Sequence, residues 1–177
     1  PTLQSLDRSS RVVYLNTFTK SLAPSMRIGY MVIPPELMER FDSRLGFYAC
    51  TVPVFEQLIL AEFLKRGYFE RHVSRLRKLY LSRREHFIKS LEDSALSGML
   101  EVKRSSGGTH LLLRATNGMS ERELVERAAG EGVRVYGLSE YYSFGSNPDE
   151  SRVIAGYSGM SAQDISRGIA ALERAWL

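Results

Sequence analysis

The sequence predicts an α/β chain in which short strands and helices are arranged around one long helix. Short β-branched or aromatic runs, bounded by proline or polar residues, indicate strands near residues 12–15 and 28–33. A helical pattern runs from Tyr68 to Leu91. A helix of roughly two dozen residues is about 36 Å long, which is enough to bridge two domains. Beyond Asp93, shorter strands and helices indicate a small α+β unit.

Length and composition limit the class of protein. The 177 residues, 44% hydrophobic and 25% charged, are typical of a globular protein with one domain, or with a small domain plus part of another. Charged residues interrupt the longest apolar windows before the ~18 residues of a membrane-spanning helix, so we expect no membrane contact. The single cysteine, Cys50, excludes an internal disulfide. It fits a reducing cytosol, although it fits other places too, and we expect a cytoplasmic protein.

The beginning of the chain is unusual. It lacks an initiator methionine, and from Pro1 it enters the first strand within a dozen residues. The lead from Pro1 to Asp7 has no clear pattern and is expected to be unstructured. We therefore expect a fragment of a longer protein.

A loop that carries a lysine separates the first two strands. It runs from Asn16 to Tyr30, so Lys20 is expected on a short loop at the end of a strand. A proline pair ends the second strand and suits the first turn of a helix. Helices are expected at residues 36–41 and at about 54–65, with Gly67 ending the second. This second helix is apolar nearly all round, so we expect it to be buried or to lie at an interface.

One face of the long helix is basic. Its cations are Arg71, Arg75, Arg77, Lys78, Arg83, Arg84 and Lys89. Glutamates at positions 70, 85 and 92 permit salt bridges along the helix, so a solvated face is favoured and a helix that binds nucleic acid is the alternative. The modest net charge of +4 agrees with the first interpretation.

The second half is expected to contain strands, two helices and tight turns. Strands are expected at residues 100–103, 109–113, 133–136 and 152–157, with turns or bulges at 105–108 and 147–149. Ser120 is expected to cap a helix from Glu121 to Glu131, with Glu123 in the capping-box position. A closing helix is expected to run from its cap, Ser161, to Trp176.

Lys20 is the first candidate for chemistry. Most loop lysines are solvated surface charges, and this is the default interpretation. Thr17 and Thr19 place hydroxyl groups near Lys20 in sequence, and Arg27 offers a planar fork suited to phosphate. A lysine that forms a Schiff base needs a partly desolvated site near cationic groups. Arg27 supplies a nearby cation, and a position at the end of a strand suits partial desolvation.

The stretch around Lys20 resembles a known signature. Residues 17–30 read Thr-Phe-Thr-Lys-Ser-Leu-Ala-Pro-Ser-Met-Arg-Ile-Gly-Tyr, which resembles the S-F-S-K-x-L-x-P-x-x-R-x-G-Y signature of pyridoxal-phosphate (PLP) aminotransferases of fold type I. The Lys-to-Arg spacing is most similar to the MocR/GabR branch, whose members are bacterial regulators that join a GntR-type winged-helix DNA-binding domain to an aminotransferase-like domain. Residues 52–84, with Gln57, His72, Arg75, Arg77, Tyr80, Arg83 and Arg84, and residues 132–142 also resemble that branch.

This resemblance implies the C-terminal part of a fold type I PLP-dependent transferase. Residues 1–75 are then a remnant of the large PLP-binding domain with the lysine loop, and residues 76–177 are the small C-terminal domain, joined to it by the long helix. The resemblance implies PLP held as a Schiff base on Lys20, with Thr17, Thr19 and Arg27 as further cofactor-binding residues. It also implies a homodimer and an amino compound that displaces Lys20, whose freed amine then shuttles a proton.

Arg152 is the candidate for substrate binding. Aminotransferases commonly place an arginine on this late strand to hold the substrate carboxylate. If residues 156–158 match the family's G-[FY]-A, the usual arginine position holds Ile154, and Arg152 lies two residues earlier on the same face of the strand. An ordinary arginine at a strand end is the alternative.

The third candidate is the stretch Gly107–His110, as part of the mouth of a pocket. A glycine pair more often marks a bulge, and it lacks the helix start of a phosphate cradle. His110, like His72 and His86, has no cysteine or carboxylate partner at metal-ligand spacing, so we expect no metal.

Several parts of a complete PLP site belong upstream of the lysine in this family. They are an acidic residue for the pyridine nitrogen, an aromatic side chain stacked on the ring and a glycine-rich phosphate loop. Asp7 lies too early in the chain to replace the acidic residue. DNA binding would likewise belong to a winged-helix domain outside this sequence.

Three hypotheses follow from the sequence. The first is the C-terminal portion of a MocR-type regulator in which PLP on Lys20 reports an amino compound to a DNA-binding domain. The second is part of a stand-alone aminotransferase that acts on an amino acid. The third is a folded but inert domain, and the identity of the amino compound is left open by all three.

Overall fold

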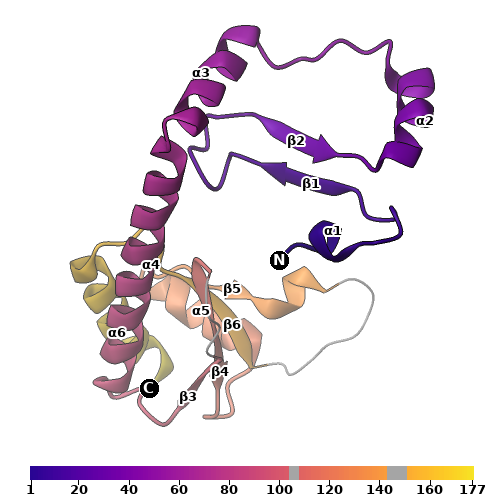
Figure 1. The fold of residues 1–177 in the computed structure, drawn as a ribbon. Coiled ribbons are helices and arrows are strands. Elements are labelled where there is room, and N and C mark those ends of the chain that lie inside the picture. The colour runs from indigo at the N-terminus through magenta and orange to yellow at the C-terminus, as the bar shows by residue number, and fades with distance from the viewer. Residues whose placement is uncertain (104–107, 143–150) are drawn as a thin grey trace. The chain divides into compact units, whose positions relative to one another are not determined.

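The computed structural model describes residues 1–103, 108–142 and 151–177 (Figure 1). The chain divides into two compact units, Pro1–Arg75 and Leu76–Leu177, and each is described by itself. Helix α4 (Tyr68–Glu92) contributes residues 68–75 to the first unit and the remainder to the second. It confirms the predicted long helix to within one residue. The turns predicted at residues 105–107 and 147–149 lie outside the described residues.

The first unit contains an antiparallel hairpin of β1 (Tyr14–Thr17) and β2 (Gly29–Val32), with Thr17 opposite Gly29. Strand β1 begins two residues later than predicted. The carboxylate of Asp7 accepts hydrogen bonds from the backbone of Arg11 (2.6 Å) and Val12 (2.8 Å), so the first part of the apolar run is held outside the ladder.

A short helix, α1 (Leu3–Leu6), occupies the lead that was expected to be unstructured. The hydroxyl of Thr2 accepts a hydrogen bond from the backbone of Ser5 (3.1 Å) and so caps the helix. This expectation was wrong because Thr2 supplies the cap that a helix start needs.

Helices α2 (Pro35–Leu45) and α3 (Val54–Lys65) complete the first unit. Helix α2 continues four residues beyond the predicted end, since Gly46 is the first residue to interrupt its pattern. Helix α3 has the predicted bounds and ends before Gly67, which adopts a positive φ of 67°. Among its apolar side chains only Leu60 is buried, whereas Phe55 is 72% exposed. Of the two predicted alternatives, burial within this chain is therefore excluded, and the interface stays a prediction.

The second unit is built on a four-stranded sheet in which all neighbours are antiparallel. The strand order is β3 (Leu100–Lys103), β4 (His110–Ala115), β6 (Arg152–Gly156) and β5 (Tyr136–Gly137). The strand predicted at residues 133–136 is reduced to the two residues of β5. The backbone N–H of Val133 instead donates to the carbonyl of Ala128 (2.9 Å), which closes the end of the preceding helix.

Helices α4, α5 (Glu121–Gly130) and α6 (Ala162–Trp176) cover one face of this sheet. Alternate residues of β4 and β6 point into the core beneath them, namely Leu111, Leu113, Ala115, Val153 and Ala155. Trp176, which is 1% exposed, donates from Nε1 to the carbonyl of Leu124 (3.0 Å) and so ties α6 to α5. The core of this unit thus has a sheet on one side and three helices on the other.

Two capping boxes set the starts of α5 and α6. Ser120 pairs with Glu123, and Ser161 pairs with Asp164, each through both a side-chain and a backbone bond. The predicted caps Ser120 and Ser161 are confirmed. In the three described ranges, no helix has both the length and the apolar character needed to cross a membrane.

Candidate functional site

The lysine loop is residues 18–28, between β1 and β2, and hydrogen bonds across it fix its shape. The backbone of Phe18 donates to Ile28 (3.0 Å), and that of Leu22 donates to Phe18 (2.8 Å). The hydroxyl of Thr19 donates to the carbonyl of Met26 (3.2 Å), so Thr19 braces the loop from within. Lys20 lies in the turn between these bonds with its side chain exposed.

Aromatic packing anchors the underside of this loop. The ring of Phe18 lies 5.5 Å from that of Tyr30 on β2 and 5.6 Å from that of Phe69 at the start of α4. Ile28 is 7% exposed, whereas the neighbouring Arg27 is exposed. The loop therefore keeps its apolar side chains against the unit and presents Lys20 and Arg27 to solvent.

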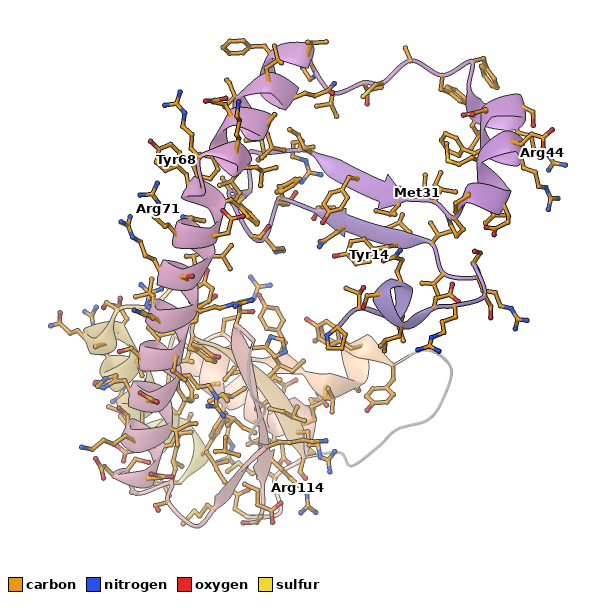
Figure 2. All side chains as sticks on the ribbon, viewed as in Figure 1. Tyr14, Met31, Arg44, Tyr68, Arg71 and Arg114 are labelled. Atoms are coloured by element: carbon orange, nitrogen blue, oxygen red, sulfur yellow. The ribbon has the colours of Figure 1, made fainter. Side chains whose placement is uncertain are left out.

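Thr17 lies at the end of β1, where the two strands come close together. A Cβ atom on Gly29, its partner in the ladder, would lie 3.4 Å from Thr17 Cγ2 and 3.3 Å from the carbonyl oxygen of Asn16. Both distances are short for such contacts, so glycine fits this position best. Figure 2 shows Tyr14 and Met31 on the same two strands.

The donor set of the loop fits a phosphorylated aldehyde. Lys20 provides an amine, Thr17 a hydroxyl and Arg27 a guanidinium that suits phosphate, and all three are exposed on one hairpin. Thr19 belongs to the same loop, although its hydroxyl donates to Met26. Within the described residues, no group of three or more histidine, cysteine, aspartate or glutamate side chains is arranged to hold a metal.

Arg152 lies in the second unit, at the start of β6. It shares with Ile154 the face of the sheet that the helices leave open, because Val153 and Ala155 between them point into the core. A cavity of about 310 Å³ on this face is lined by Glu101, Val102, Lys103, Leu112, Arg114 and Arg152. His110, at the start of β4, is exposed and lies opposite Gly156.

Arg114 is a residue that the sequence reasoning missed. It stands directly opposite Arg152 in the β4–β6 ladder and donates to Glu101 on β3 (3.2 Å). Like charges directly opposite each other are unfavourable, so this carboxylate offsets part of the repulsion. The alternation of β4 indicated that Arg114 faces away from the core, but the pairing register is not visible in the sequence.

Comparisons with known proteins extend over nearly the whole chain, although no family model matches it. The chain is 39% identical over 99% of its length to the uncharacterised HTH-type transcriptional regulator YhdI of Bacillus subtilis. It is 36% identical over its whole length to the probable rhizopine catabolism regulatory protein MocR of Rhizobium meliloti. It spans 37% and 35% of these two proteins.

A solved structure gives the fold. The α-aminoadipate aminotransferase LysN of Thermus thermophilus, complexed with N-(5'-phosphopyridoxyl)-L-leucine, matches with a TM-score of 0.76 and 25% identity. The match covers 93% of this chain and 41% of that one. This chain is an aminotransferase-like relative of the MocR-type regulators. The predicted family and the predicted fold type I are confirmed.

The MocR-type stretch at residues 52–84 lies on helices α3 and α4 and on the segments that flank α3. Gln57 on α3 donates to the carbonyl of Val52 (2.9 Å), which fixes the approach to that helix. On α4, Arg83 donates to the carbonyl of Ser158, and Arg71 lies over the ring of Tyr68 at 4.6 Å (Figure 2). These residues therefore shape the scaffold of each unit.

The last MocR-type stretch, residues 132–142, contains β5 and a 3₁₀ turn (Leu138–Tyr141). Glu121, at the start of α5, accepts hydrogen bonds from the backbone (3.0 Å) and the hydroxyl of Ser139. Gly137 leaves room for this carboxylate, since a Cβ atom there would overlap it. Glu121 thus fixes the turn that follows β5.

Proposed function

We propose that this chain is the aminotransferase-like effector part of a MocR-type transcriptional regulator, which binds PLP through Lys20 and takes an amino compound as ligand. One observation carries the proposal. Lys20, Arg27 and Thr17 belong to one braced hairpin, in a chain that is 36% identical to MocR. The fold match to an aminotransferase complexed with a phosphopyridoxyl amino acid supports PLP as the cofactor.

In this proposal Lys20, Thr19 and Arg27 of the loop, and Thr17 at the end of β1, have separate tasks. Lys20 Nζ would hold the cofactor covalently and, when its amine is free, would take a proton from the ligand Cα. Arg27 and the hydroxyl of Thr17 hold the phosphate. Thr19 contributes to cofactor binding chiefly by bracing the loop through Met26. When bound, PLP supplies the electron sink for the reaction at the ligand Cα.

Arg152 is proposed to hold an anionic group of the ligand. Its place on the open face of the sheet, directly opposite Arg114, supports this role. If residues 156–158 match the family's G-[FY]-A, the usual arginine position holds Ile154. This apolar side chain lies on the same face of the strand, two residues after Arg152. An ordinary strand-end arginine is the competing interpretation. A test is the affinity of the assembled protein for an amino acid, which Arg152→Gln is expected to lower and Ile154→Val to leave unchanged.

The proposal extends to partners outside this chain. DNA binding belongs to a winged-helix domain elsewhere in the protein, and the assembled protein is a cytoplasmic homodimer. Similarity to YhdI, an HTH-type transcriptional regulator, and to MocR, a probable regulatory protein, supports a regulatory role. A stand-alone aminotransferase is the second candidate, which the structural match to LysN favours. Sequence upstream of Pro1 separates the two, since a winged helix there supports the regulator and an aminotransferase large domain alone supports the enzyme.

The role of Lys20 is tested by trapping the cofactor. The chain, and the longer protein that contains it, are incubated with PLP, reduced with borohydride and digested for mass spectrometry. We expect a phosphopyridoxyl group on Lys20, because this lysine shares its hairpin with the hydroxyls of Thr17 and Thr19 and with Arg27. Arg27→Gln is expected to weaken PLP binding, since it removes the guanidinium that we assign to the phosphate.

A matched control is Lys65→Ala, which removes an amine at the end of α3. It should leave cofactor trapping unchanged, whereas Lys20→Ala should abolish it. Labelling that survives Lys20→Ala in the longer protein would overturn the assignment of Lys20. Absence of any labelling in the longer protein would support the inert-domain hypothesis.

A further inference from the structure

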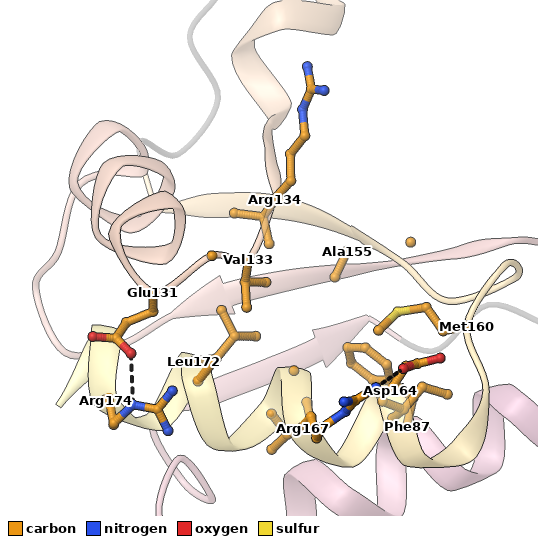
Figure 3. Close-up of a pocket in the computed structure, with 17 residues that line it drawn as sticks. Phe87, Glu131, Val133, Arg134, Ala155, Met160, Asp164, Arg167, Leu172 and Arg174 are labelled. Atoms are coloured by element: carbon orange, nitrogen blue, oxygen red, sulfur yellow. Dashed lines mark hydrogen bonds and ion pairs between the residues drawn. The ribbon is translucent and has the colours of Figure 1, made fainter.

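A second cavity, of about 490 Å³, lies in the second unit between α6 and residues 131–135, the segment that leads from α5 to β5 (Figure 3). It contains neither the lysine loop nor Arg152. Small-molecule sites typically have volumes of about 300–1,000 Å³, so the cavity has the size of a ligand site.

The floor of the cavity is apolar. It is formed by Phe87, Val133, Ala155, Met160, Ile165 and Leu172. Figure 3 shows Val133, Leu172 and Met160 pointing into the space above α6. An apolar floor of this kind favours a ligand with an aromatic or branched body.

A glycine on α6 keeps the cavity open. A Cβ atom on Gly168 would meet only Met160 Cε, at 3.6 Å. Gly168 lies in the interior of α6, where glycine lowers helix stability relative to alanine. A larger side chain at this position would therefore enter the free volume.

The rim of the cavity is charged. Its lining includes Arg134, Arg167, Arg174, Glu131 and Asp164, which together carry a formal charge of +1. Arg174 donates to Glu131 (2.7 Å) and to the carbonyl of Ala170 (3.0 Å), which closes one end. The side chain of Arg134 points away from the cavity (Figure 3), and its guanidinium lies over the ring of Tyr136 at 5.1 Å. With Arg134 turned away, the rim holds two arginine–carboxylate pairs. Among the described residues Arg174 donates to two partners and Arg167 to one, so Arg167 is the cation left to receive an anion.

Arg167 is held in place for this role. It donates from Nη2 to Asp164 (2.5 Å), and Asp164 in turn accepts bonds from the hydroxyl and the backbone of Ser161. A guanidinium has five N–H groups in a planar fork, and within the described part of the chain Arg167 uses one of them. The remaining fork matches a carboxylate.

We propose that this cavity binds a small organic acid, whose apolar body packs on the floor and whose carboxylate pairs with Arg167. The site is separate from the proposed function, because it requires neither Lys20 nor PLP. It gives the chain a second ligand, an acidic effector, in addition to the amino compound.

The test uses the whole chain without PLP, with ¹³C-methyl-labelled methionine and 3-phenylpropionate as the probe. We expect saturable shifts of the Met160 methyl signal and none of Met31, which lies on the hairpin. The uncharged 3-phenylpropan-1-ol should bind about fivefold more weakly, the size expected of an exposed ion pair. Absence of a Met160 shift, or equal affinity for the acid and the alcohol, would overturn the proposal.

Two variants locate the binding groups. Arg167→Gln should lower the affinity for the acid to that for the alcohol, whereas Arg122→Gln, an 85% exposed arginine on α5 outside the cavity, should leave both unchanged. Gly168→Leu should fill the cavity and abolish binding of both probes, with the fluorescence of the single tryptophan, Trp176, confirming the fold. Unchanged acid affinity in Arg167→Gln would contradict the assignment of the carboxylate. Since PLP is absent throughout, failure here leaves the role of Lys20 untouched.

Discussion

The two units differ in how they bury apolar side chains. The second unit has a core made by β4, β6 and three helices, with Leu113 and Leu124 completely buried. In the first unit, which is described throughout, Ile28 and Leu60 are the buried hydrophobic residues, whereas Leu15 and Phe47 are 68% and 77% exposed. Because apolar burial is the main stabilising term in folding, the second unit is expected to be the stable one.

This difference separates stability from the candidate chemistry. The loop with Lys20 and Arg27 belongs to the unit with the smaller core, and its shape depends on local hydrogen bonds and on the ring of Phe18. A ligand or partner that covers the first unit would therefore stabilise the lysine loop directly. A ligand in the cavity beside α6 would act on a unit that is already well packed.

Hydrogen exchange is expected to show the largest contrast between the units. Backbone amides of β4 and β6 should exchange at least about a hundredfold more slowly than those of β1 and β2, because their opening requires loss of the core of the second unit. The measurement is native-state exchange read by mass spectrometry or NMR. Equal protection in the two sheets would show that the units open together and would remove the contrast.

Core truncation should give the next largest effect. Leu113→Ala is expected to lower the free energy of unfolding of the second unit by about 2–5 kcal/mol, since it leaves a cavity among packed side chains. The signal is the fluorescence of Trp176, the only tryptophan, which is buried in that core.

The matched control in the first unit is Leu15→Ala, at a strand position where the side chain is 68% exposed. It is expected to change the same free energy by no more than about 0.5 kcal/mol. A loss as large as that of Leu113→Ala would mean that the first unit contributes to the stability that Trp176 reports.

Much of the fold was predictable from local signals. Proline and glycine punctuation located α3, and the Ser-x-x-Glu pattern at Ser120 located α5. These signals depend on residues within one turn of each other, so a sequence contains all the information they need. The family signature around Lys20 likewise identified the fold, because it depends on a contiguous stretch.

Contacts that reach beyond one turn were not predictable. At short separation in sequence, Val133 donates to Ala128 and not to a neighbouring strand, which shortens β5, and the carboxylate of Asp7 delays the start of β1. The pairing of Arg114 with Arg152, and the cavity beside Gly168, arise only when strands and helices from separate parts of the chain meet. No local sequence pattern encodes contacts between such separate segments, because strand register and packing are set by the whole unit.

Helix caps provide a smaller test of the same contrast. Ser161→Ala should lower the free energy of unfolding of the second unit by about 1 kcal/mol, because it removes the cap of α6. Ser43→Ala, on the exposed side of α2 in the first unit, is the matched control and should leave the Trp176 transition in place. The denaturant midpoint of each variant is measured by tryptophan fluorescence. A shift of the midpoint in Ser43→Ala would show that the first unit contributes to the stability that Trp176 reports.

The smallest expected effect concerns two carboxylates, one in each unit. The hydroxyl of Ser161 and the guanidinium of Arg167 lower the pKa of Asp164 to about 2 from its ordinary 3.8. Backbone N–H groups of Ser9, Val12 and Arg11 lower the pKa of Asp7. In both cases the unfolded chain binds the proton more readily, so each contribution to stability is present above the ordinary pKa. For Asp164 it is lost as the pH falls from about 4 to about 2.

Urea makes these two groups independent reporters of the units. At a concentration that unfolds the first unit alone, the pKa of Asp7 should return to its ordinary value while that of Asp164 stays near 2. Carboxyl ¹³C NMR titration measures both in one sample, and Ser161→Ala should raise the pKa of Asp164 without changing that of Asp7. If both pKa values return together as urea is added, the chain unfolds as one cooperative body, and the weaker core of the first unit does not limit the stability of the lysine loop.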